Sequence, residues 1–150
     1  MIALPSNFQR TKEWLIACGK EPGVQCLSVQ FGCHVEEFIE LLDQMRFASA
    51  ADEAAVASAI PSLKYLSVNL KRGYTHCSVL NRAEALDALC DLEVTGNGVA
   101  YLAGLHKEEA DQAVLASNDA KLVDGKPLIL EGGKIGKPVG WQAPDLTPFI

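Results

Sequence analysis

The chain has 150 residues, of which 49% are hydrophobic and 21% are charged, and its formal net charge at pH 7 is −6. This balance is typical of a folded globular domain and excludes a disordered or fibrous chain. The acidic charge leaves no broad cationic surface for a nucleic-acid backbone, so we expect no duplex DNA or RNA partner.

The residue order predicts five helices followed by an irregular tail. A capping box at Ser6–Gln9, helical periodicity, an Asn81 cap and glycine stops place these helices at about residues 7–18, 27–47, 50–72, 82–103 and 106–117. Pro61 is expected to divide or kink the third helix, because proline lacks the N–H group that a helix interior requires.

The tail from residue 121 contains turn signals at Asp124-Gly125 and Gly132-Gly133, and a short hairpin pairing 126–130 with 134–137 is possible. The predicted architecture is therefore an all-α bundle of four to five helices with an irregular C-terminal tail. We expect a single domain over residues 1–150, with a helical core over 7–118 and a C-terminal strap over 119–150.

The cysteines indicate a reducing, cytoplasmic setting. There are five of them, an odd number that cannot pair completely within one chain, and no two form a CxxC motif. The N-terminal residues lack the basic and apolar segments of a leader, and no window approaches the length that a bilayer crossing needs. We therefore expect no membrane partner.

Glu36, Glu37 and Glu40 form an E-E-x-x-E pattern in the second helix. With about 3.6 residues per turn, these carboxylates share one side of the helix, away from its apolar stripe. Taken alone, such a pattern is most often a solvated helix face.

A second set of acidic residues makes a metal site a better explanation than a solvated face. Glu84, Asp87 and Asp91 align along the fourth helix, whose other sides are apolar, so we expect this helix to be buried with its acids pointing inward. Few basic residues lie near in sequence to neutralise them, and buried carboxylates are costly without a cation. Mg²⁺, which prefers oxygen ligands and which Mn²⁺ can replace, is the expected cation.

Other residues have two readings each. Asn118 and Lys121, one helical turn apart, can hold phosphate oxygens or end a helix. Trp14 can stack on a nucleobase or pack in the core, and Trp141 can cover a site or pin the tail. Gly96 and Gly98 weaken the fourth helix, so we expect another helix or a ligand to approach them closely.

In order and spacing, these motifs resemble the all-α nucleoside triphosphate pyrophosphohydrolases, the superfamily of MazG and phosphoribosyl-ATP pyrophosphohydrolase. The matching segments are Glu36-Glu37-x-x-Glu40, Glu84 to Asp91 and Ser117-Asn118-x-x-Lys121, while the tail from Asp124 to Leu146 resembles a phage- and mobile-element-associated branch. The resemblance extends from about Phe8 to Leu146. It implies Mg²⁺-dependent hydrolysis of a ribo- or deoxyribonucleoside triphosphate to the monophosphate and pyrophosphate, in a homodimer or homotetramer.

The resulting expectations are specific. Metal ligands are Glu37, Glu40, Glu84, Asp87 and Asp91; catalytic residues are Glu36, Glu37, Glu40, Asp87 and Asp91; substrate contacts are Trp14, Asn118, Lys121 and Lys126. The chain departs from the family at Ala88, where a glutamate is expected, and Asp87 is its substitute. The alternatives are a non-catalytic helical module that binds a metal or a protein, and a pyrophosphohydrolase for phosphoribosyl-ATP or a modified nucleotide.

Overall fold

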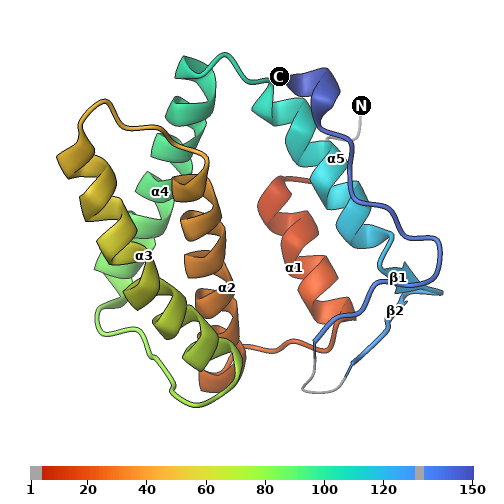
Figure 1. The fold of residues 1–150 in the computed structure, drawn as a ribbon. Helices are drawn as coiled ribbons and strands as arrows, with labels where there is room; N and C mark the ends of the chain where they lie inside the picture. Colours follow the sequence, from red (N-terminus) through yellow and green to blue (C-terminus); the bar gives the residue numbers. More distant parts are fainter. Residues whose placement is uncertain (1–4, 131–133) are drawn as a thin grey trace. The chain divides into compact units, whose positions relative to one another are not determined.

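The structure is a computed structural model that describes residues 5–130 and 134–150 (Figure 1). Helices make up 63% of it, which confirms the all-α prediction. In chain order they are α1 (Asn7–Ala17), α2 (Val24–Asp43), α3 (Ala50–Lys71), α4 (Arg82–Leu102) and α5 (Lys107–Asp119).

Local signals account for most of the helix ends. The Ser6 hydroxyl accepts the Gln9 N–H at 3.2 Å at the start of α1, and the Asn81 side chain accepts the Ala83 N–H at 3.0 Å at the start of α4. The predicted start of α2 is wrong by three residues, because the helix begins directly after Gly23. The helix α3 runs through Pro61 undivided, since the missing N–H removes only one hydrogen bond from a run of strong helix formers.

The chain forms two compact units. One unit comprises Met1–Glu21 with Leu80–Ile150 and contains α1, α4, α5 and the tail. The other, Pro22–Val79, is a hairpin of α2 and α3. Each unit is described by itself below, and the predicted single domain stays a prediction.

The α2–α3 hairpin packs through small residues. A Cβ atom added at Gly32 of α2 would lie 3.0 Å from the Leu70 Cβ and 3.0 Å from the Ser67 carbonyl oxygen, both in α3. The Ser67 hydroxyl donates to the Gly32 carbonyl at 2.8 Å, and Leu70 of α3 and Ile39 of α2 are both buried. Absence of a side chain at residue 32 therefore allows the two helix backbones to approach closely.

A buried serine ties the end of the hairpin together. The Ser28 hydroxyl donates to the Val24 carbonyl at 2.6 Å and accepts the Cys77 N–H at 2.9 Å, and the residue has no solvent exposure. This fastens the segment after α3 to the first turns of α2.

The tail contains a two-residue hairpin of β1 (Leu122–Val123) and β2 (Lys126–Pro127), which pair in antiparallel fashion. Asp124 and Gly125 form its turn with φ of 51° and 72°. Beyond it, Ile129 bridges Ile135 within the predicted pairing of 126–130 with 134–137, while the Gly132-Gly133 turn signal lies outside the described residues. A short 3-10 helix, η2 (Thr147–Phe149), follows.

None of the helices in the described ranges combines the length and apolar character that a bilayer crossing requires.

Candidate functional site

The first acidic set lies on α2 within an uninterrupted helix, so its sequence spacing translates into neighbouring positions one turn apart. Glu37 and Glu40 are exposed, whereas Glu36 is partly buried. The Glu36 Oε1 accepts a hydrogen bond from the Lys71 Nζ of α3 in an ion pair. The hairpin thus supplies Glu36 with a lysine from far along the chain, a partner that the residues near in sequence did not indicate.

The second acidic set lies on α4, also without interruption. Glu84, Asp87 and Asp91 are all exposed, and Ala100 is the one residue of this helix that is buried among those described. The other described residues of its own unit therefore do not bury α4. A helix that is apolar on every side is stabilised when another element covers it, but the sequence of that helix does not determine which element does so.

The apolar surface of α4 is extensive. Leu89 is 56% exposed, and Leu86, Leu92, Val94 and Leu102 are exposed as well. Nothing in the described chain lies within 4 Å of a Cβ atom added at Gly96 or Gly98. The close neighbour predicted for these two glycines is thus not supplied by the described residues of the unit that contains α4.

The carboxylates suit Mg²⁺ in kind, since oxygen ligands are those it prefers. Glu37 with Glu40, and Asp87 with Asp91, each place two carboxylates one turn apart on one helix. Across residues 5–130 and 134–150, no three histidine, cysteine, aspartate or glutamate side chains gather closely enough to hold a metal ion. The two acidic sets thus have the type of ligand atom that Mg²⁺ prefers. That they face each other stays a prediction.

The C-terminal end of α5 joins two predicted substrate residues. The Lys121 Nζ donates to the Asn118 Oδ1 at 2.8 Å, so the predicted phosphate contacts do lie together. The indole of Trp14 donates to the Asn118 carbonyl at 2.8 Å. Carbonyls in the last turn of a helix lack partners within the helix, and this contact fixes Trp14 against the end of α5.

A second indole binds the same helix end. The Trp141 Nε1 donates to the Ser117 carbonyl at 2.8 Å, so of the two readings for Trp141 the one that pins the tail is confirmed. The Lys137 and Lys121 ammonium groups lie 4.4 and 5.4 Å from the centre of the Trp141 ring, within cation–π range. Sequence reasoning missed Lys137, because the irregular tail has no helical periodicity that would predict its contact with Trp141 four residues later.

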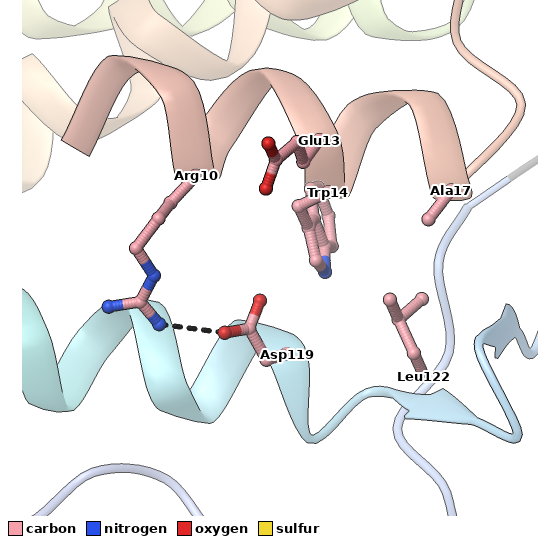
Figure 2. A pocket seen from close by; sticks show the side chains of 6 residues that line it. All are labelled: Arg10, Glu13, Trp14, Ala17, Asp119 and Leu122. Carbon is pink, nitrogen blue, oxygen red and sulfur yellow. Dashed lines mark hydrogen bonds and ion pairs between the residues drawn. The ribbon is translucent and has the colours of Figure 1, made fainter. Parts of the chain in front are cut away.

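A pocket of about 250 Å³ opens between α1 and the end of α5 (Figure 2). Its lining residues are Arg10, Glu13, Trp14, Ala17, Asp119 and Leu122. The Arg10 guanidinium bridges the two helices through an ion pair with the Asp119 carboxylate at 2.7 Å. Of these residues, sequence reasoning named only Trp14. The four residues from α1 follow the pattern i, i+3, i+4, i+7 and therefore share one helix face.

Two further residues, a cysteine and a predicted phosphate contact, belong to the same unit. Burial raises the pKa of the Cys18 thiol, and the nearby Lys20 and Lys121 charges partly oppose that rise, so the thiol stays protonated at neutral pH. Lys126 is exposed on β2, and its predicted phosphate contact stays a prediction.

Comparisons with protein-family models, with curated proteins and with solved structures find no match for this chain.

Proposed function

We propose that the chain is a Mg²⁺-dependent pyrophosphohydrolase that converts a nucleoside triphosphate to the monophosphate and pyrophosphate. The observation that carries the proposal is the placement of both acidic sets in unbroken helices, which preserves the spacing of the two motifs as aligned carboxylates. Departure from the family at Ala88 is offset by Asp87, which shares a face with Asp91.

In this proposal Glu37, Glu40, Glu84, Asp87 and Asp91 hold Mg²⁺. When bound, Mg²⁺ would neutralise the triphosphate and lower the pKa of a bound water. The Glu36 carboxylate, held on one oxygen by Lys71, orients the attacking water through the other. Water attacks a phosphorus of the triphosphate chain, and pyrophosphate leaves.

Substrate contacts come from the end of α5 and from α1. Asn118 and Lys121 are already paired with each other, which holds an amide and an ammonium group ready for phosphate oxygens. Lys126 adds a further cation from β2. Trp14, fixed by its hydrogen bond to Asn118, offers an aromatic surface for the base.

A homodimer or homotetramer is part of the same proposal. It is supported by the exposed leucines of α4, because contiguous apolar surface on a soluble chain marks an interaction site. Open space at Gly96 and Gly98 leaves room for a helix of a second copy to approach α4 closely.

The test is Glu40→Gln, assayed for pyrophosphate release from a panel of nucleoside triphosphates with Mg²⁺. We expect release to fall at least about a hundredfold while the circular dichroism spectrum is unchanged, since a ligand carboxylate is lost from an exposed position. Glu53→Gln, an exposed glutamate on α3, is the matched control and should retain full release. Equal turnover by both variants contradicts the assignment.

A second function is favoured by one observation, the exposed apolar surface of α4. In this reading the chain is a non-catalytic module that binds a protein partner through α4. Absence of pyrophosphate release from every nucleotide in the panel, with an intact fold, supports this module against the enzyme. Product identification by chromatography separates the further possibility of phosphoribosyl-ATP or a modified nucleotide as substrate.

A further inference from the structure

The contact between α1 and α5 is made by long polar side chains. The Asn7 amide donates to Asp111 at 3.2 Å, and the Arg10 guanidinium donates to Gln112 at 2.8 Å and to Asp119 at 2.7 Å. Figure 2 shows Arg10 reaching from α1 to Asp119 on α5, with Trp14 beside the pair. Because these long side chains make the contact between α1 and α5, space for a pocket remains between the two helices.

We propose that this pocket binds the guanine base of a nucleotide. The inference deepens the proposed function and rests on it for the ligand being a nucleotide. The volume of about 250 Å³ lies below the range of roughly 300–1,000 Å³ typical of drug-sized ligands, so it suits one flat ring system rather than a whole nucleotide. Trp14 supplies the surface on which that ring stacks.

Arg10 and Glu13 supply the polar groups that would bind the edge of the base. They lie three residues apart on one face of α1, so a cationic donor stands next to an anionic acceptor. Guanine presents the matching order along its edge, with the O6 and N7 acceptors next to the N1–H and N2–H donors. Arginine pairs with O6 and N7, and a carboxylate accepts the two adjacent N–H groups.

Both side chains retain capacity for a ligand. The Arg10 guanidinium uses two of its five N–H donors on Gln112 and Asp119. The Glu13 Oε1 accepts the Gln9 amide at 2.6 Å, while the other carboxylate oxygen has no hydrogen bond to the described residues. Asp119 acts as a positioning residue, because its ion pair with Arg10 aims the guanidinium across the pocket.

The other bases fit this arrangement less well. Adenine carries an amino donor where guanine carries O6, and that donor would face the donors of Arg10. Uracil and cytosine offer a single ring, which covers less of the Trp14 surface. Lys121 donates to Asn118, the residue whose carbonyl accepts the Trp14 indole, so a cation for the phosphates of the nucleotide adjoins the residue that would stack on its base.

The experiment is calorimetric titration of the full chain, without metal and with a chelator present, using GMP, IMP, AMP, CMP and UMP. We expect GMP to bind about tenfold more tightly than AMP or UMP, and IMP, which lacks the 2-amino group, to fall between them. Glu13→Gln should weaken GMP about tenfold and leave UMP unchanged, while Glu21→Gln, an exposed acid in the same unit, should match the parent chain.

Equal binding of all five nucleotides, tighter binding of AMP than of GMP, no detectable binding, or an unaltered GMP affinity in Glu13→Gln would each overturn the inference. Because these titrations contain no metal and involve no turnover, their failure is separate from a failure of pyrophosphate release. Selective GMP binding in a chain that hydrolyses nothing supports the pocket while it removes the proposed reaction.

Discussion

The helices α2 and α4 are alike in sequence and differ in their surroundings. They have 20 and 21 residues, and each carries aligned acids, many apolar residues and an interior glycine. In α2, Gly32 lies against the backbone of α3, and Gly32 and Ile39 are buried. In α4, Gly96 and Gly98 face open space within the described chain, and Leu86 is 64% exposed.

The difference teaches that apolar content alone does not determine what a helix packs against. The α2–α3 contact depends on a position without a side chain and on the Ser67 hydroxyl, which bonds a backbone carbonyl across the interface. The α4 surface has the apolar side chains but no such partner among the described residues of its own unit. A second copy is the partner that the proposed assembly supplies.

The largest expected effect comes from Leu89→Glu on α4. If a second copy covers this helix, an unpaired carboxylate in the contact should dissociate the assembly, because burying an uncompensated charge is very costly. The mass measured by light scattering after gel filtration should fall to that of a monomer. Val139→Glu places the same charge on a fully exposed tail residue and should leave the mass unchanged; a monomeric parent chain would contradict the assembly.

The next effect tests the glycines directly. Gly32→Ala should lower the free energy of unfolding by about 2 kcal/mol, because the new Cβ atom meets the Ser67 carbonyl oxygen and the Leu70 Cβ at 3.0 Å. Urea denaturation in the Leu89→Glu background, where α4 is uncovered, measures it.

Gly96→Ala is the matched control in the same background. With no atom within 4 Å of its Cβ in the described chain, this change should raise the free energy of unfolding by up to about 1 kcal/mol through helix propensity. Equal destabilisation by both substitutions would erase the contrast between the two helices.

The third and smallest of the destabilising effects concerns Ser28→Ala. Loss of the hydroxyl leaves the Cys77 N–H without its acceptor at a buried position, so the free energy of unfolding should fall by about 1.5 kcal/mol. Ser62→Ala, on an exposed position of α3, should change it by less than about 0.5 kcal/mol. A Ser28→Ala chain as stable as the Ser62→Ala chain would show that this tie contributes nothing to the hairpin.

Prediction from sequence succeeded where the signal is local. The Ser6 and Asn81 caps fixed two helix starts, and the turn at Asp124-Gly125 was placed correctly. Pro61 does not divide α3, since the helix propensity of its neighbours outweighs one missing hydrogen bond. Of the predicted site, the Asn118–Lys121 pair was found because its members lie one turn apart.

The contacts that sequence reasoning missed join distant residues. Lys71 reaches Glu36 only after α2 and α3 fold together, and Arg10 reaches Gln112 only after α1 packs against α5. The pocket wall formed by Asp119 opposite Arg10 likewise joins residues that are far apart in the sequence.

The sequence by itself determined the five helices, their caps and the alignment of acids along α2 and α4, since these depend on residues within about one turn of each other. Tertiary structure alone decided that Gly32 contacts α3 while Gly96 meets no described residue within 4 Å, and that Asp119 of α5 closes a pocket with Arg10 and Trp14 of α1. The physical reason is that periodicity fixes which side chains share a helix face, whereas the partner of that face depends on how the chain closes its long loops.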